Sequence, residues 1–414
     1  MAKKQEKNII TGLDIGTSKV VALIGEVTAD GAIEIIGLGC HPSRGLKRGV
    51  VVDIEATVNT IQRAVQEAEL MAGCEVRSVY TGIAGSHIRS LNSHGIVAIR
   101  DKEVSQVDVE RVIDAAKAVA IPADQKILHI LPQEFIVDNQ GSIREPAGMA
   151  GVRLEARVHI VTGAVSAAQN IIKCVRRCGL EVNDIILEQL ASSHAVLTED
   201  EKELGVCLID IGGGTTDIAV FYDGAIQYTA VIPIAGDQVT NDIAMALRTP
   251  TKAAEAIKIK HAFAMPELAK TSDMLEVLSM NERPGRKISA KVLSEVVSAR
   301  YEELFSLVRN ELRRHGLEQR LAAGVVITGG GSCVQGGIEL AEVCFEMPVR
   351  HGYAQHQRVS GLVEATVNPS LATCVGLLLH GFQQQYEGSY NVPALNDSSK
   401  GVWRRMKEWF HGNF

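Results

Sequence analysis

Two aspartates each stand at the end of an apolar run and are followed by a turn of glycine and small hydroxyl residues. The first turn is "DIGTSK", from Asp14, and the second is "DIGGGTTD", from Asp210 to Asp217. Such turns can direct successive backbone N–H groups at a phosphate because no bulky side chain blocks the approach. The residues expected around phosphates are Asp14, Gly16, Thr17, Ser18 and Lys19 in the first turn and Asp210, Gly212, Gly213, Gly214, Thr215 and Thr216 in the second.

Asp14 and Asp210 are the expected carboxylates for a hydrated Mg²⁺, which prefers one or two carboxylates together with phosphate oxygens and waters. One such turn alone also fits a tight hairpin with a capped aspartate. Two copies, each opening a three-strand pattern, favour two hairpins that grip one phosphate chain from opposite sides.

A third glycine turn, "ITGGGS", lies between an expected strand and an expected helix. Its residues Gly329, Gly330, Gly331 and Ser332 would let a flat adenosine lie against bare backbone. Neither a G-x-x-x-x-G-K-[ST] loop nor a G-x-G-x-x-G fingerprint occurs in the chain, so two common alternatives for nucleotide binding are not supported.

The apolar periodicity predicts the elements that position these turns. Three strands open the chain and a helix follows over 54–73; residues 87–159 form a small insertion of strands and one helix; a second three-strand segment begins near 206; and 250–315 is mainly helical. Two internal echoes indicate a duplicated domain: "GLDIGTSKVVALIGEV" with "LIDIGGGTTDIAVFYDG", and "HIVTGAVSAAQN" with "VVITGGGSCVQG".

Composition excludes several classes of protein. The 414 residues, 46% hydrophobic, are enough for two or more domains, and the formal charge of -7 argues against a general nucleic-acid binder. The N-terminal residues lack the apolar core of a signal peptide, and no run reaches the 18 or so apolar residues of a spanning helix. The eight cysteines show no C-x-x-C pair, so we expect reduced thiols of a cytosolic protein and no metal bound by cysteine.

The three glycine turns, in this order, resemble the phosphate, phosphate and adenosine motifs of the actin-like ATPase superfamily. Over essentially its whole length the chain resembles the FtsA family of bacterial cell-division proteins. The resemblance lies in "EPAGMAGVRLEARVHIVTGA" (145–164), the insertion before it, "RYEELFSLVRNEL" (300–312) and the final residues.

This resemblance implies an α/β, actin-like fold: a duplicated ribonuclease-H-like pair of domains with a cleft between them, an inserted α+β subdomain called IC, and a C-terminal amphipathic helix on a flexible linker. The implied boundaries are 1–86 and 163–193 for subdomain IA, 87–162 for IC, 194–248 and 313–366 for IIA, 249–312 for IIB, 367–385 for a helix returning to IA, 386–400 for the linker and 401–414 for the amphipathic helix.

The resemblance also assigns roles to residues outside the three turns. Glu188 and Asp217 are implied to position the attacking water, and Gly236, Glu255 and Lys258 to contact the nucleotide, the last two at the ribose and base. Two alternatives stay open: Glu188 as a solvated carboxylate at a helix start, and Glu255 with Lys258 as a surface ion pair three residues apart on a helix.

The function implied by the resemblance is that of a polymer-forming adaptor that binds ATP and Mg²⁺ and hydrolyses ATP weakly. It would tether FtsZ to the cytoplasmic face of the inner membrane at the division septum and recruit later division proteins through IC. The residues implied to bind the FtsZ C-terminal peptide are Lys291, Arg300, Tyr301 and Glu303. The alternative is that Tyr301 belongs to the core and the charges form a solvated face.

The last fourteen residues, "GVWRRMKEWFHGNF", contain both tryptophans of the chain. On a helix, the apolar side chains share an arc of about 120° and the charged ones fill the opposite side; the residues expected at a membrane are Val402, Trp403, Arg404, Arg405, Met406, Lys407, Trp409 and Phe410. Four cations (Lys400, Arg404, Arg405, Lys407) against Glu408 give a local charge of +3, which suits an anionic leaflet. A helix that folds back on the core is the alternative.

Two other functions stay open, and a third is disfavoured. A small-molecule kinase of the same fold would use the same turns, and an FtsA-like cytoplasmic scaffold of type IV pilus assembly would be a binding protein with no affinity for the FtsZ peptide. A chaperone ATPase is disfavoured because no peptide-binding domain follows the nucleotide-binding unit.

Overall fold

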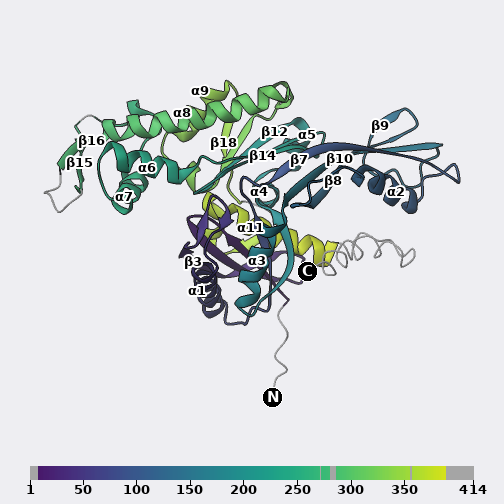
Figure 1. The fold of residues 1–414 in the computed structure, drawn as a ribbon, viewed down its shortest axis with the longest axis horizontal. Helices are drawn as coiled ribbons and strands as arrows, with labels where there is room; N and C mark the ends of the chain where they lie inside the picture. Colours follow the sequence, from purple (N-terminus) through teal and green to yellow (C-terminus); the bar gives the residue numbers. More distant parts are fainter. Residues whose placement is uncertain (1–7, 271, 280–285, 355–356, 388–414) are drawn as a thin grey trace, which may run out of the picture.

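The computed structural model describes residues 8–270, 272–279, 286–354 and 357–387, which form two α/β domains with a smaller sheet inserted in the first (Figure 1). The first domain has a six-stranded sheet in the order β11-β6-β1-β2-β3-β19. Its strands are β1 (Ile9–Ile15), β2 (Lys19–Val27), β3 (Ile33–Pro42), β6 (Ser78–Ile83), β11 (Glu181–Leu187) and β19 (Val359–Gly361). β1, β2 and β3 are antiparallel neighbours, whereas β6 is parallel to β1 and to β11.

Helices cover both faces of this sheet: α1 (Ile54–Ala72), α3 (Val165–Arg177), α4 (Glu188–Val196) and α11 (Ala372–Phe382). Because side chains alternate along a strand, Val20, Ala22 and Ile24 of β2 pack with α1 and α3. Val21 and Leu23 pack with α4 and α11 on the other face. The apolar runs of the opening strands are thus explained by burial on both faces.

The second domain has a five-stranded sheet in the order β14-β13-β12-β17-β18. Its strands are β12 (Val206–Ile211), β13 (Thr216–Tyr222), β14 (Ala225–Ile232), β17 (Val325–Thr328) and β18 (Val349–His351), and its helices are α5 (Glu199–Leu204), α6 (Gly236–Ala246), α7 (Thr251–His261), α8 (Ala290–Arg314) and α9 (Gly337–Phe345). The long helix α8 runs across one side of this domain (Figure 1). The second three-strand segment therefore repeats the first, as predicted.

One of the two predicted internal echoes is wrong. The strand paired in parallel with β12 is β17, and the strand paired in parallel with β1 is β6, so "SVYTGI" is the counterpart of "VVIT". The segment from His159 instead lies in β10 (Arg153–Ala164), in the inserted sheet. The echo was misleading because both segments have an apolar strand before a small-residue turn and a helix.

The inserted subdomain is the small α+β unit that the sequence predicts. Its four-stranded sheet has the order β7-β10-β8-β9, and its elements are β7 (Arg89–Ala98), α2 (Gln106–Lys117), β8 (Gln125–Val137), β9 (Gln140–Ile143) and β10. Helix α2 begins with a capping box, in which Ser105 accepts from the backbone N–H of Asp108 at 3.2 Å, and packs its apolar side on this sheet.

The inserted subdomain also contacts the edge strand β14 of the second domain. The hydroxyl of Ser90 donates to the carbonyl of Thr229 at 2.9 Å, and the amide of Gln133 donates to the carbonyl of Ile226 at 3.1 Å. The buried His159 lies 3.0 Å from the hydroxyl of Thr229, and burial lowers its pKa to about 4, so the ring is neutral. The insertion thus joins the two domains through side chains.

The region predicted to be mainly helical contains a small hairpin as well. β15 (Met274–Val277) and β16 (Arg286–Ser289) pair between α7 and α8, with Leu275 and Val277 buried. Strands of four residues are too short to show a clear period of two, and β16 has no fully buried residue. The remaining short strands are β4 (Leu46–Lys47) and β5 (Val50–Val51), and a short helix α10 (Val363–Val367) precedes α11.

No helix of the described residues is long and apolar enough to span a membrane. The predicted amphipathic helix (401–414) and most of the predicted linker (386–400) lie outside the described residues.

Candidate functional site

The two aspartate–glycine turns face each other across the junction of the two domains. A Cβ atom built on Gly213 would lie 2.8 Å from Cβ of Ser18, and one on Gly214 would lie 2.7 Å from Oγ1 of Thr17. Both distances are shorter than ordinary contacts, so only glycine fits at these two positions. The first and second turns therefore lie against each other at the domain junction, and whether they hold phosphates stays a prediction.

Four carboxylic acids converge behind these turns. Asp14 ends β1, Asp210 and Asp217 lie on β12 and β13, and Glu188 begins α4. The three aspartates are buried, and Glu188 is half-buried at the end of β6, where Gly82 leaves room for its side chain. One oxygen of Asp217 accepts from Thr215 at 3.0 Å, while the other is buried and has no hydrogen-bond partner among the described residues.

Burial and mutual repulsion raise the pKa values of this group. Burial, opposed by Lys19 and increased by Asp210, raises the pKa of Asp14 to about 7, and burial together with Asp210 raises that of Asp217 to about 8. Burial first, and then the three aspartates, raises the pKa of Glu188 well above its usual range. This arrangement holds protons when no cation is present, and a cation would replace them.

Asp210 is held by hydroxyl groups from the two helices that connect the domains. Ser192 of α4 donates to Oδ2 of Asp210 at 2.6 Å, and Thr373 of α11 donates to the same atom at 3.2 Å. The two hydroxyls are also 3.0 Å apart. Sequence reasoning missed both residues, which are buried hydroxyls on helices ("LASSHAV" and "LATCVG").

Lys19 of the first turn reaches the segment that precedes α11. Its ammonium donates to the hydroxyl of Ser370 at 2.5 Å, and that hydroxyl donates to the amide oxygen of Asn368 at 2.7 Å. The link joins the first turn to the chain returning from the second domain. Sequence reasoning assigned Lys19 to the phosphates and did not foresee Ser370.

The third glycine turn packs against the second. Gly329 has a φ of +85°, and a Cβ atom there would lie 2.3 Å from Oδ1 of Asp210. Gly331 comes equally close to Ile211, and the hydroxyl of Ser332 donates to the carbonyl of Gly329 at 2.7 Å. The glycines allow this turn to lie directly on the end of β12. A cavity of about 630 Å³ opens beside it, lined in part by Phe263, Cys333, Val334, Ile338 and His351.

The Glu255 and Lys258 pair also lies beside the second turn. Their side chains form an ion pair at 2.7 Å, and the ammonium of Lys258 donates to the carbonyl of Gly236 at 3.0 Å. The backbone N–H of Gly236 in turn donates to the carbonyl of Gly212 at 3.1 Å. The ion pair that the sequence offered as an alternative is therefore present. It lies beside the second turn rather than on a remote surface.

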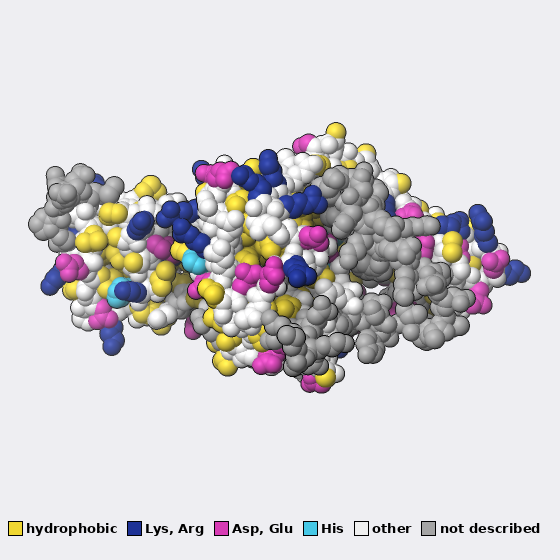
Figure 2. All heavy atoms as spheres, turned by 90° about the horizontal axis from the view of Figure 1, so that it is seen from below, with side chains coloured by type: hydrophobic (Ala, Val, Ile, Leu, Met, Phe, Trp, Pro, Cys, Tyr) yellow, Lys and Arg dark blue, Asp and Glu magenta, His cyan; other side chains and the backbone are white. Residues whose placement is uncertain are grey.

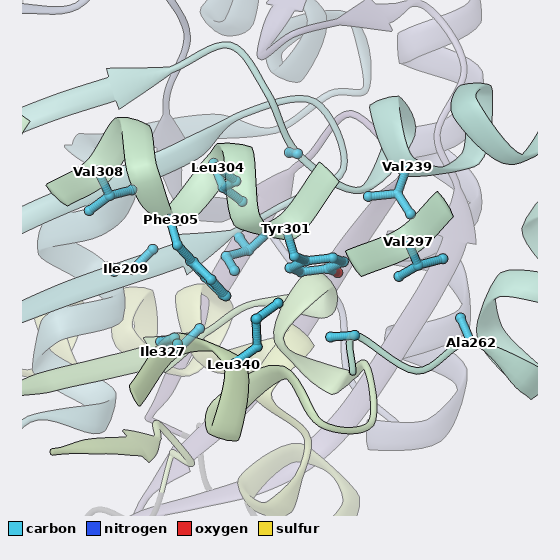
Figure 3. Close-up of a cluster of buried hydrophobic side chains, with 14 of the residues drawn as sticks. Ile209, Val239, Ala262, Val297, Tyr301, Leu304, Phe305, Val308, Ile327 and Leu340 are labelled. Carbon is cyan, nitrogen blue, oxygen red and sulfur yellow. The ribbon is translucent and has the colours of Figure 1, made fainter. Parts of the chain in front are cut away.

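The residues predicted for peptide binding lie in different environments, one in the core and the others at the surface. Tyr301 is 3% exposed, packs in the core of the second domain (Figure 3) and donates to the carbonyl of Gly331 at 2.7 Å. It is therefore unavailable to a peptide in this conformation, and its hydroxyl supports the third glycine turn instead. Arg300 forms a two-point ion pair with Asp242, at 2.5 and 3.0 Å, and a second pair with Glu303, while Lys291 and Glu303 are exposed.

No group of three or more His, Cys, Asp and Glu side chains in the described part of the chain is arranged to hold a metal ion directly. A cation between the four carboxylates would therefore be reached through water or through phosphate oxygens. Hydrated Mg²⁺, which keeps several of its waters, fits that requirement.

The two domains share one sheet topology, are joined by two connecting helices and carry opposed aspartate–glycine turns. These features define the actin-like ATPase fold, and comparisons with solved structures agree. The "PilM-PilN type IV pilus biogenesis complex" matches with a TM-score of 0.65 at 16% identity, over 90% of this chain and 98% of that one. MreB5 of Spiroplasma citri bound to ADP matches with a TM-score of 0.55 at 15% identity, over 93% and 99%.

Sequence comparisons give the particular family. The family model for cell division protein FtsA matches residues 207–376, and that for the SHS2 domain inserted in FtsA matches 85–162. Cell division protein FtsA of Pseudomonas aeruginosa is 62% identical over the full length of both chains, and that of Escherichia coli is 44% identical, also over both full lengths. The chain belongs to the FtsA family of cell-division proteins.

Proposed function

We propose that the cleft binds ATP with Mg²⁺ and that the nucleotide acts mainly as a switch of polymer state, with slow hydrolysis. The observation that carries this proposal is the set of four carboxylates behind two opposed glycine turns. Backbone N–H groups of the turns would hold the phosphates, and Asp14 and Asp210 would hold the ion through its waters. Mg²⁺ would supply the positive charge that lets phosphates and carboxylates lie close together.

The proposed nucleotide lies with its base near the third turn. The adjoining cavity and the bare backbone of Gly329 to Gly331 support this orientation. The half-buried Glu188 and the buried Asp217 would hold and orient a water at the phosphate end of the nucleotide. Glu188 would be protonated in the absence of the ion. MreB5 of Spiroplasma citri, solved with ADP and with AMPPNP, supports nucleotide binding by this fold.

The wider role in the proposal is that of an adaptor. Copies of the chain would assemble into filaments, hold the FtsZ C-terminal peptide on the second domain, attach to anionic lipids of the inner membrane through 401–414, and reach later division proteins through the inserted subdomain. Membership of the FtsA family supports a division role. A pilus scaffold is less supported, because the pilus complex shares only 16% identity with the chain.

The surface beside the predicted peptide-binding residues supports a peptide partner. Exposed apolar side chains occur on the end of the molecule that carries β15 and β16 (Figure 2). They are Met245, Ile259, Met274 and Leu278. The exposed Lys291 would add a positive charge for an acidic peptide, and Arg300 would exchange its ion pairs with Asp242 and Glu303 for the peptide.

Titration of the full chain with a fluorescent ATP analogue, with and without Mg²⁺, tests the nucleotide proposal. We expect binding that requires Mg²⁺ and is displaced by unlabelled ATP. Absence of binding under both conditions would refute the proposal. Steady ATP consumption that depends on a small co-substrate would favour a kinase instead.

Arg300→Glu is expected to weaken binding of the FtsZ C-terminal peptide roughly tenfold, about 1.4 kcal/mol. The change removes a cation from the proposed surface and places a carboxylate beside Asp242 and Glu303. Fluorescence anisotropy of a labelled peptide measures the affinity. Arg313→Glu, on the same helix but half-exposed at its far end, is the matched control and should bind as the unaltered protein does. Equal affinity of the two variants would remove Arg300 from the peptide site.

Trp409→Glu is expected to release the protein from anionic liposomes, because burial of an aromatic side chain is worth about 1.5–3 kcal/mol and the new charge would have to enter the membrane. Co-sedimentation with vesicles measures the bound fraction. His411→Glu makes a similar charge change on the polar side of the expected helix and should reduce binding less. If the two variants bind equally well, the tail does not use an apolar face.

A further inference from the structure

The short hairpin between β3 and α1 is tied to the first glycine turn at two points. The backbone N–H of Ser43 donates to the carbonyl of Ser18 at 2.9 Å, and that of Gly49 donates to the hydroxyl of Thr17 at 3.0 Å. The hairpin itself consists of β4 and β5, paired at Leu46 with Val51 and at Lys47 with Val50. Its tip, Arg48 and Gly49, is therefore fixed beside the expected phosphate position.

The same tip touches the second glycine turn from across the domain junction. A Cβ atom built on Gly214 would lie 2.9 Å from Cα of Arg48, nearly as close as it would lie to Thr17. Arg48 thus stands where the backbones of both turns meet. An arginine side chain that starts here is long enough to reach a phosphate held between the turns.

The backbone at the tip is unusual for an arginine. Arg48 has a φ of +50° and Gly49 a φ of +76°, so two successive residues adopt the left-handed conformation. That conformation costs a residue with a Cβ atom about 1 kcal/mol or more, and it is concentrated at functional sites. Glycine or asparagine would adopt it more easily, so the arginine is not explained by the turn.

The Arg48 side chain is also available to bind a ligand. It is exposed, and within the described part of the chain it forms no ion pair and no hydrogen bond through its guanidinium. Lys19, the other cation of the turns, is already bonded to Ser370. A guanidinium offers a planar pair of donors that matches two phosphate oxygens, which a lysine cannot reproduce.

We propose that Arg48 contacts the terminal phosphate of a bound nucleoside triphosphate and makes the site discriminate between triphosphate and diphosphate. The inference rests on the proposed function of the cleft as a nucleotide site. The hairpin tip also adjoins the chain that enters the inserted subdomain, since a Cβ atom on Gly49 would lie 3.0 Å from the carbonyl of Ala84 and from Cα of Gly85.

Competition of ATP and ADP against a fluorescent nucleotide, with Mg²⁺ present, tests this inference on the full chain. The variant is Arg48→Asn, because asparagine tolerates the left-handed backbone and removes only the guanidinium. We expect ATP affinity to fall roughly tenfold and ADP affinity to stay within twofold of the unaltered protein. Arg48→Lys should recover the affinity only in part.

Arg77→Asn is the matched control: it makes the same change in charge on a residue of the same domain that is 86% exposed, and it should leave both affinities unchanged. Equal losses for ATP and ADP in the Arg48→Asn protein, or no loss for either, would overturn the inference. If the unaltered chain bound neither nucleotide, the proposed function itself would fail. Selective loss of ATP affinity would distinguish Arg48 from residues that support the fold.

Discussion

Asp210→Asn is expected to abolish Mg²⁺-dependent nucleotide binding while leaving the fold intact. Asparagine keeps an oxygen that can accept the hydroxyls of Ser192 and Thr373, but it removes the charge that would hold the hydrated ion. Loss of one charged partner from a buried site costs about 3 kcal/mol, which corresponds to roughly a hundredfold in affinity. Titration with a fluorescent ATP analogue over a range of Mg²⁺ concentrations measures the effect.

Asp101→Asn, an exposed carboxylate of the inserted subdomain, is the control and should not change the affinity. Thermal unfolding without nucleotide separates loss of binding from loss of fold, since Asp210→Asn should not lower the melting temperature. Unchanged Mg²⁺ dependence in a folded Asp210→Asn protein would contradict the site assignment.

The same acidic cluster has a consequence for stability in the absence of a cation. Burial, with Asp210 as an added cause, raises the pKa of Asp14 to about 7 and that of Asp217 to about 8, above the values near 4 of an unfolded chain. The folded state therefore binds more protons, so stability falls as the pH rises from about 4 to about 8. Asp210→Asn should make this fall shallower, which melting temperatures measured across that pH range would reveal.

Gly376→Val is expected to have the largest effect on stability. Gly376 lies in α11 against α4, and a Cβ atom there would lie 1.8 Å from the carbonyl oxygen of Ala191 and 2.3 Å from its carbon. The backbone of one connecting helix thus lies directly on the other. A valine would force the helices apart, at a cost of about 3 kcal/mol or more. Denaturant unfolding measures the change in the free energy of unfolding.

Ala115→Val, on the exposed side of α2, is the matched control and should cost less than about 0.7 kcal/mol, the difference in helix propensity. A Gly376→Val protein within 1 kcal/mol of the unaltered one would mean that the two helices can separate easily. Since Ser192 and Thr373 lie on these same helices, a folded variant should also bind Mg²⁺ more weakly.

The phosphate turns could be predicted from sequence because their chemistry is local. The motif of an aspartate at a strand end followed by glycines is complete within six residues. The sheet topology then places the two copies opposite each other. The inserted α+β subdomain was predicted for a similar reason, as a change of pattern along the chain. Each of these features is determined by neighbouring residues.

The parts that sequence reasoning missed depend on residues distant in the chain. The hydroxyls that hold Asp210 come from positions 18 and 163 residues away, so nothing near Asp210 indicates them. Tyr301 has charged neighbours on its helix, yet its own side chain faces the core and supports Gly331. The strand β10 copies the pattern of β17 but pairs with the inserted sheet, because pairing partners are chosen by topology rather than by local pattern.

The contact between the inserted subdomain and β14 has a further consequence for assembly. An uncovered edge strand presents backbone groups that another chain can join as an added strand, which leads to aggregation. Here Ser90, Asn92 and Gln133 donate to backbone carbonyls of β14, so side chains occupy acceptors that a foreign strand would need. The contact that joins the inserted subdomain to the second domain therefore also caps this edge of the five-stranded sheet.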